Sequence, residues 1–271
     1  MGDERLETIL RLSRETLKAI YKKKIDYLSE DGGYFKRLLN FEINHLDFRT
    51  GHLLDGSEKF LRPLSLDEVN ELLSKTKPWE GESPIDPITE IYPLLDNLWM
   101  ARFIQITIER YLTNNKDGRL PGAINSTGWE GRSGMRTKYR YRIEETYEFW
   151  KIEQFLIRKS TSLPHINGLV VDNSPMRDMD PLASEIQSIL VLTHESLLNE
   201  EYRHHRVIPV TLITGSGTQI RITHGNVDVE EGRMSLWMTP IIDLVADEKE
   251  KKDDLLRVLG WVVGEPVGNT I

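Results

Sequence analysis

Two β-prone runs decide the fold: Val207-Ile-Pro-Val-Thr-Leu-Ile-Thr214 and Thr218-Gln-Ile-Arg-Ile-Thr-His224, separated by Gly215-Ser216-Gly217. Val, Ile and Thr are enriched in strands, and a short glycine-containing gap between two such runs is typical of a β-hairpin. A phosphate-binding loop would need a helix directly after the glycines, whereas here a second strand follows them. The stretch therefore predicts an antiparallel hairpin over residues 207–227.

Apolar residues recur at spacings of three and four in several segments, which predicts amphipathic helices. The N-terminal segment has the longest such pattern, over residues 4–28, and Gly32-Gly33 ends it. Ser65 and Glu68 form the capping-box pattern that starts a helix over residues 66–75. Further helices are expected over residues 34–40, 87–112, 181–198 and 249–263.

Two other segments favour strands, and a third is open between helix and strand. Residues 147–157 suit a helix by the spacing of their apolar residues and a strand by their aromatic content. Residues 163–171 predict a strand with a turn at Asn167-Gly168, and residues 235–245 predict a strand interrupted by Pro240.

The order of these segments predicts an α+β fold. We expect a helical region over residues 1–120 that packs on an α/β region over residues 135–271, in which helices flank the central antiparallel hairpin 207–227. The loop between them, around residues 118–134, is rich in glycine and proline, which is typical of a boundary.

Composition excludes several classes of protein. The 271 residues contain no cysteine, which excludes disulfides, thiolate nucleophiles and iron–sulfur clusters. No apolar run reaches the roughly 18 residues that span a bilayer, so we expect no membrane association. The absence of cysteine is typical of a reducing compartment, so we expect a cytoplasmic location. The net charge of −8 disfavours nucleic acid as a partner, although a local basic face could still bind an anion.

The hairpin and the closing stretch Gly260-Trp-Val-Val-Gly-Glu-Pro-Val-Gly268 resemble a block found in filamentous-fungal proteins of no assigned activity. The resemblance covers about the last 80 to 90 residues of the chain. It implies a fungal source. Its motifs are structural, so it implies no catalytic residue and no cofactor.

Polar residues within predicted strands and helices are candidates for acid–base chemistry. Asp243 lies in an apolar strand pattern, His224 lies near the end of the second hairpin strand, and Glu185 lies within a helix. These three are the candidate catalytic residues, and Arg221, from the same strand as His224, is a candidate substrate-binding residue. Asp243 has two interpretations: it faces water on an edge strand, or it is desolvated, with a raised pKa that suits a general acid or base.

A basic segment precedes the ambiguous residues 147–157. As a strand, it would place Arg136, Lys138, Arg140 and Arg142 on one side, where their like charges repel unless an anion binds. That anion is either an acidic side chain of the protein itself, such as Glu144, or a phosphate, carboxylate or nucleic-acid ligand. Arg136 and Arg140 are the candidate ligand-binding residues.

Signatures of metal and cofactor sites are weak. His194-Glu195 has no second histidine four residues after His194, as a zinc-binding helix would require. Ser133 and Ser216 lie beside glycines but not in the GxSxG pattern of hydrolases. We therefore expect neither a cofactor nor a metal.

Two functions remain as hypotheses. The first is a cofactor-independent acid–base enzyme of the isomerase, cyclase or lyase type, acting on a small organic molecule of fungal specialised metabolism. The second is a noncatalytic interaction protein that binds an acidic partner through the basic strand. A cleft lined by His224, Arg221 and Asp243 would favour the enzyme, and a flat basic patch would favour the interaction protein.

Overall fold

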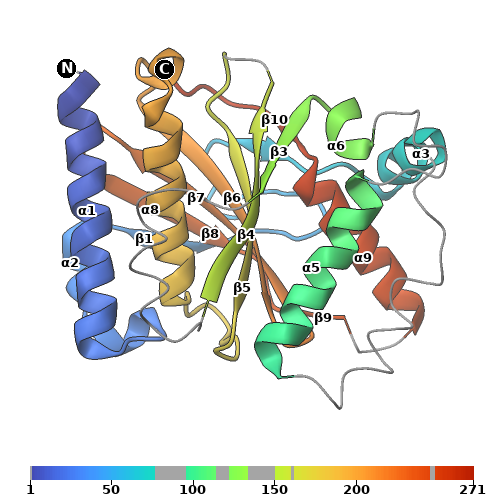
Figure 1. Ribbon diagram of the computed structural model, residues 1–271, viewed down its shortest axis with the longest axis horizontal. Helices are drawn as coiled ribbons and strands as arrows, with labels where there is room; N and C mark the ends of the chain where they lie inside the picture. Colours follow the sequence, from blue (N-terminus) through green and yellow to red (C-terminus); the bar gives the residue numbers. More distant parts are fainter. Residues whose placement is uncertain (1, 77–95, 114–121, 134–149, 160–161, 245–247) are drawn as a thin grey trace.

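The computed structural model describes residues 2–76, 96–113, 122–133, 150–159, 162–244 and 248–271. In these residues, helices cover both faces of one large mixed β-sheet (Figure 1). The α+β fold class predicted from the sequence is confirmed.

The strand order of the sheet is β1-β8-β7-β6-β5-β4-β3, and β9 pairs with β7. Two neighbouring pairs are parallel, β1 with β8 and β5 with β6, and the other pairs are antiparallel. A separate antiparallel pair joins β2 to β10. The strands are β1 Glu42–His45, β2 Leu61–Arg62, β3 Trp129–Ser133, β4 Trp150–Arg158, β5 Ile166–Asp172, β6 Val207–Ser216, β7 Gln219–Asp228, β8 Arg233–Met238, β9 Ile242–Asp243 and β10 Glu265–Pro266.

The helices form the two outer layers (Figure 1). On one face, α8 (Ala183–Leu198) packs on the sheet and α1 (Gly2–Lys23) packs on α8, with the short α2 (Tyr34–Leu39) beside α1. On the other face lie α5 (Asn97–Thr113) and α9 (Glu248–Val262), and α3 (Leu66–Thr76) packs on α9. Short elements complete the described fold: α6 Ala123–Ser126, η1 Leu28–Asp31 and η3 Glu200–Tyr202.

Each face of the sheet has its own hydrophobic core. Ile189 of α8 and Val210 of β6 belong to the first, and Ile104 of α5 and Ile213 of β6 belong to the second. Since successive residues of a strand point to opposite faces, β6 supplies side chains to both cores. This accounts for its nearly continuous apolar and β-branched sequence, which is buried from residue 208 to residue 216.

The hairpin predicted over residues 207–227 is confirmed. β6 pairs antiparallel with β7, and the closing residue pair is Ser216 with Gln219. Gly217 in the turn has a φ of 56°, a backbone conformation that favours glycine. The glycine-rich stretch is therefore a turn between strands.

Other predicted elements are also found in the described residues. The capping box of α3 forms as predicted: the backbone N–H of Glu68 donates to Ser65 Oγ at 3.3 Å, and that of Ser65 donates to Glu68 Oε2 at 2.7 Å. The ambiguous segment 147–157 is a strand where it is described, as β4. None of the described helices is long and apolar enough to cross a membrane.

The turn predicted at Asn167-Gly168 is wrong, because β5 runs through both residues. A Cβ on Gly168 would lie 2.8 Å from Leu192 of α8 and 2.9 Å from Leu212 of β6, so the glycine allows these layers to pack closely. Asn167 donates to the carbonyl oxygen of Val262 at 2.8 Å, at the C-terminus of α9. Both residues serve tertiary packing, which a local turn signal does not detect.

Residues 1–120, for which the sequence predicts only helices, also contribute the strands β1 and β2. β1 extends the main sheet through its parallel pairing with β8, and β2 pairs with β10 near the C-terminus. The parallel pairing of β5 with β6 was also not predicted. It arises because α8 connects the two strands across one face of the sheet.

Candidate functional site

Two of the four candidate residues outside the basic strand meet in the core between α8 and the sheet. Arg221 of β7 and Glu185 of α8 form a paired contact, in which Arg221 Nε donates to Glu185 Oε1 at 3.1 Å and Arg221 Nη2 donates to Glu185 Oε2. Both side chains are completely buried. Thr223 and the backbone N–H of Leu182 also donate to the Glu185 carboxylate. The ion pair is therefore supported by further hydrogen bonds, as a buried charge requires.

The same pair holds the loop that connects β5 to α8. Arg221 Nη1 donates to the carbonyl oxygen of Arg177 at 2.7 Å and lies 3.4 Å from that of Asp180. Since Arg221 is 0% exposed, these contacts hold protein groups together and leave it little access to a ligand. We infer that Arg221 and Glu185 stabilise the fold at this place.

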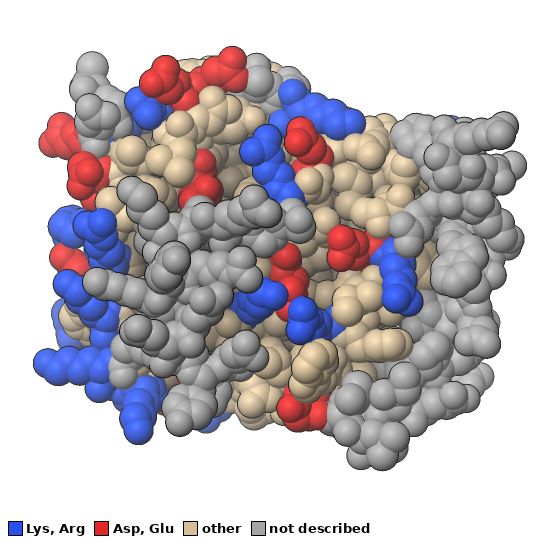
Figure 2. All heavy atoms as spheres, viewed as in Figure 1, with Lys and Arg blue, Asp and Glu red and all other residues tan. Residues whose placement is uncertain are grey.

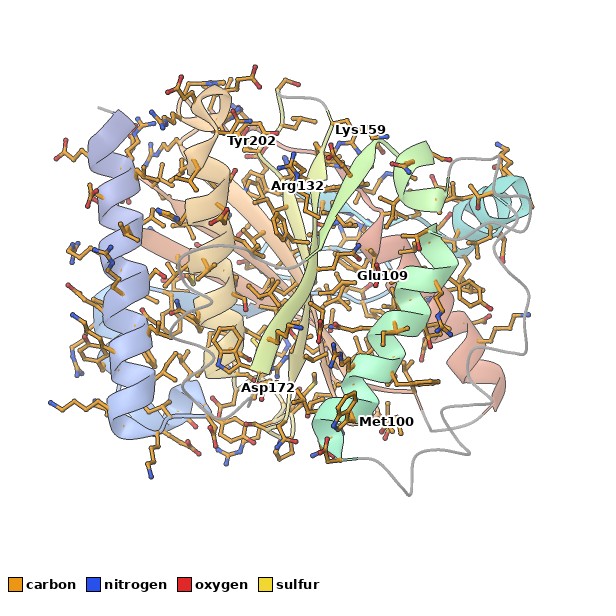
Figure 3. All side chains as sticks on the ribbon, in the orientation of Figure 1. Met100, Glu109, Arg132, Lys159, Asp172 and Tyr202 are labelled. Atoms are coloured by element: carbon orange, nitrogen blue, oxygen red, sulfur yellow. The ribbon has the colours of Figure 1, made fainter. Side chains whose placement is uncertain are left out.

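Asp172 lies at the C-terminal end of β5 (Figure 3), and burial, together with the nearby negative charge of Glu185, raises its pKa. Its carboxylate accepts a hydrogen bond from the backbone N–H of Ser174 at 2.8 Å, and its side chain is buried. Burial raises the pKa of Asp172 to about 6. Because β5 and β6 are parallel neighbours, this carboxylate lies at the strand ends where many α/β proteins bind ligands.

Replacing Asp172 with asparagine is expected to stabilise the protein at pH 7.5 by about 1–3 kcal/mol. The folded protein keeps the Asp172 proton up to about pH 6, whereas the ordinary pKa is 3.8. The contribution of Asp172 to the free energy of unfolding is therefore present at low pH and lost as the pH rises through about 6. Asparagine stays neutral and keeps an oxygen for Ser174.

Urea denaturation of wild type and Asp172→Asn at pH 7.5 and pH 4 measures this effect. The advantage of the variant should shrink towards zero at pH 4. A variant that is destabilised equally at both pH values would show that burial does not disfavour the charged form of the Asp172 carboxylate.

His224 lies on the opposite face of the sheet from Arg221. Its ring is buried between Phe60 and Trp237, with ring centroids 6.1 and 5.9 Å away, and its Nδ1 lies 3.0 Å from Thr211 Oγ1. His165 is buried nearby, and its Nε2 lies 3.2 Å from the carbonyl oxygen of Val267. Burial lowers the pKa of His224 to about 3 and that of His165 to about 4. Both rings are therefore neutral at physiological pH.

Asp243 lies away from both groups. It is exposed at the end of β9, where it pairs with Gln219 and accepts a hydrogen bond from Thr218 at 3.0 Å. The structure thus places Asp243, His224 and Arg221 in three different surroundings, not around one cleft. Arg136 and Arg140, with the rest of the basic strand, lie outside the described residues.

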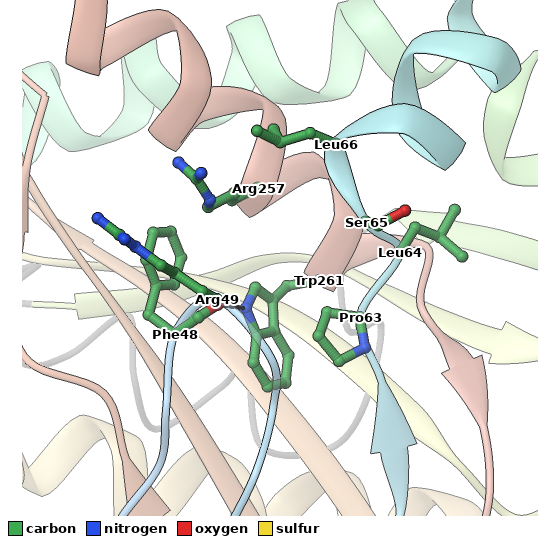
Figure 4. A pocket seen from close by; sticks show the side chains of 8 residues that line it. All are labelled: Phe48, Arg49, Pro63, Leu64, Ser65, Leu66, Arg257 and Trp261. Atoms are coloured by element: carbon green, nitrogen blue, oxygen red, sulfur yellow. Dashed lines mark hydrogen bonds between the residues drawn. The ribbon is translucent and has the colours of Figure 1, made fainter.

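A pocket of about 230 Å³ opens between α9, the start of α3 and the loop after β1 (Figure 4). Two arginines, Arg49 and Arg257, extend on the same side of it, beside the aromatic rings of Phe48 and Trp261. The remaining lining residues are mainly apolar: Pro63, Leu64, Ser65 and Leu66. The pocket thus combines an apolar wall with two guanidinium groups.

Hydrogen bonds fix the walls of the pocket. Trp261 Nε1 donates to the carbonyl oxygen of Phe48 at 2.9 Å, which ties the loop to α9. The carboxylate of Asp47 accepts hydrogen bonds from the backbone N–H groups of Arg49 and Thr50, at 3.1 and 2.7 Å. A Cβ on Gly260 would lie 2.5 Å from the Leu64 carbonyl oxygen, so only glycine permits α9 to approach the start of α3 so closely.

The electrostatics of the pocket favour an anion. Arg257 forms an ion pair with Asp254 at 3.2 Å on α9, and both side chains are partly buried. Arg49 is exposed, and none of the described residues forms an ion pair with it. No acidic side chain stands among the described lining residues, so the positive charge of the pocket is only partly balanced.

Within the described residues, no group of three or more His, Asp or Glu side chains is arranged to hold a metal ion. The chain matches no protein family, no curated protein and no solved structure. The resemblance of its C-terminal block to fungal proteins stays a prediction.

Sequence reasoning missed the pocket and Asp172. Trp261 falls within the helix predicted over residues 249–263, and Arg49 and Arg257 are isolated arginines in a chain with 35 basic residues. Asp172 had a usable signal, since a carboxylate directly after the buried run Leu169-Val170-Val171 is typical of a strand end that faces a site.

Proposed function

We propose that this protein binds a small organic anion in the pocket lined by Arg49, Arg257 and Trp261. The observation that carries the proposal is the pairing of two guanidinium groups with an apolar and aromatic wall. Guanidinium groups recognise carboxylates and phosphates through charge-assisted hydrogen bonds. The rings of Phe48 and Trp261 would contact the apolar part of the ligand.

The size of the pocket limits the ligand. A volume of about 230 Å³ is below the range of drug-sized sites and somewhat above that of a cavity that takes benzene. A ligand with one ring or a short alkyl chain and one acidic group suits these dimensions. We therefore propose small aromatic or aliphatic carboxylates as the ligand class.

Calorimetric titration with benzoate and hexanoate, and with the neutral benzamide and hexanamide, tests this proposal. We expect at least one acid to bind and its amide to bind at least about ten times more weakly, because the amide lacks the charge. Arg49→Ala and Arg257→Ala should each weaken binding of the acid by about 10-fold or more.

Arg233→Ala serves as the control, since Arg233 is an exposed arginine on β8 and does not line the pocket. Its affinity should equal that of the wild type. Equal binding of acid and amide, or unchanged affinity in both Arg49→Ala and Arg257→Ala, would contradict the proposal.

A second candidate is the acid–base enzyme of the isomerase, cyclase or lyase type, acting without a cofactor. The observation that favours it is the buried carboxyl of Asp172, whose raised pKa of about 6 suits proton transfer near neutral pH. In this proposal Asp172 takes the role that the sequence suggested for Asp243. Turnover that is lost in Asp172→Asn but kept in Asp243→Asn would support it. A cytoplasmic location and a fungal source remain part of either proposal.

A further inference from the structure

The exposed side of α1 carries a row of basic residues. Arg11, Arg14, Lys18 and Lys22 are exposed and follow one another at spacings of three, four and four residues. This is the repeat of one face of an α-helix, so the four cations form a straight stripe about 16 Å long, at 1.5 Å per residue. We call it the α1 stripe.

Most of the positive charge of the α1 stripe is not neutralised by ion pairs. Arg11 forms an ion pair with Glu15 at 3.4 Å, whereas none of the described residues forms an ion pair with Arg14, Lys18 or Lys22. Four further exposed cations lie at its C-terminal end, Lys23 and Lys24 and, on the neighbouring α2, Lys36 and Arg37. Figure 2 shows basic side chains gathered at the left edge of the molecule, over α1, with a few acidic side chains beside and above them. The patch stands out because the whole chain has a net charge of −8.

Acidic residues bound the stripe at both ends. Glu4 and Glu7 are exposed on the first turns of α1, and Asp26 and Glu30 are exposed just after its C-terminus. A long polyanion such as a nucleic acid would have to run past these carboxylates, which repel it. A partner with a short row of negative charges would avoid these end carboxylates, and within the stripe it would meet Glu15, which is paired with Arg11.

The stripe is also polar rather than amphipathic. The apolar side of α1 is already buried against α8 and the sheet, with Ile9 at 0% and Leu12 at 3% exposure. It is therefore not available for insertion into a lipid surface, which requires a free apolar face. The contact that remains is electrostatic.

We propose that the α1 stripe docks an acidic helical segment of another protein. Carboxylates spaced at i, i+4, i+8 and i+11 on an antiparallel helix would face Lys22, Lys18, Arg14 and Arg11 in turn. This inference concerns a surface separate from the pocket and from the basic strand, and it does not depend on the proposed ligand.

Fluorescence anisotropy with a labelled synthetic peptide tests the proposal. The probe is an alanine-based helix of about four to five turns with glutamates at i, i+4, i+8 and i+11. The reference is a peptide of the same composition with its glutamates spread around the helix. We expect the probe to bind at least about 5-fold more tightly than the reference, and to bind more weakly as NaCl rises from 50 to 300 mM.

The variant Arg14→Glu/Lys18→Glu should weaken probe binding by about 10-fold or more, because two attractions become repulsions. The control Arg233→Glu/Lys252→Glu changes the net charge equally at exposed positions of β8 and α9 and should bind as the wild type does. Thermal unfolding of both variants checks that they fold.

Three outcomes would overturn the inference. They are equal affinity for the two peptides, equal loss in the control variant, and tighter binding to polyuridylate or to vesicles of anionic lipid than to the probe. The last outcome would identify a phosphate-bearing partner in place of an acidic protein.

Discussion

Replacing Arg221 with methionine is expected to lower the free energy of unfolding by about 3–5 kcal/mol. The substitution leaves the carboxylate of Glu185 buried at 0% exposure without its cation. It also removes the donor that holds the Arg177 carbonyl oxygen, so the connection between β5 and α8 loses its anchor. Urea denaturation at pH 7, followed by tryptophan fluorescence, measures the loss.

Two further variants sharpen this prediction. Arg206→Met is the matched control, because Arg206 pairs with Asp228 and Glu231 but is 46% exposed, and water replaces those contacts with little effect on stability. The double variant Arg221→Met/Glu185→Met should recover part of the loss, since it leaves no unpaired charge in the core. If Arg221→Met unfolds no more easily than Arg206→Met, the pair contributes far less than its burial indicates.

Acidification from pH 7 to pH 4.5 is expected to destabilise the protein by up to about 5 kcal/mol through His165 and His224. Burial lowers the pKa of these residues to about 4 and about 3 from an ordinary value of 6.5. Between those values the unfolded chain binds protons that the folded protein does not. Stability from these groups is therefore complete above pH 6.5 and decreases as the pH falls.

Chemical denaturation at intervals between pH 7 and pH 4.5 tests this expectation. The slope of the free energy of unfolding against pH should correspond to nearly two protons bound by the unfolded chain and not by the folded protein. Asp172 reduces this number, because it takes up a proton in the folded state near pH 6. His165→Gln and His224→Gln should each reduce the slope by about one proton, whereas His52→Gln, at an exposed position, should not. If the free energy of unfolding does not change with pH, or if both variants keep the wild-type slope, the two buried rings are not held neutral by the fold.

Local patterns in the sequence predicted the elements that depend on local physics. The capping box of Ser65 and Glu68 and the β-hairpin are specified within a few residues, and both are confirmed. The prediction of a turn at Asn167-Gly168 was wrong, because these two residues are determined by tertiary contacts and not by local ones. Gly168 makes room for Leu192 and Leu212, and Asn167 binds the end of α9, and all of these partners are distant in sequence.

The candidate residues show the same division. Arg221 and Glu185 were each recognisable as polar residues in apolar patterns, but their pairing requires β7 to lie under α8, which no local signal specifies. The pocket requires three separate segments to meet around Trp261. Such sites follow from tertiary packing, so composition and spacing could suggest single residues but not the arrangement.

The parallel pairing of β1 with β8 has a consequence for synthesis of the chain. Glu42 pairs with Ser235, so this edge of the sheet cannot close until β8 has been made. The packing of α1 on α8 has the same character: until α8 has been made, the apolar side of α1 stays open to water or to a chaperone. Contacts between such distant residues also slow folding, because a long loop must close before they form.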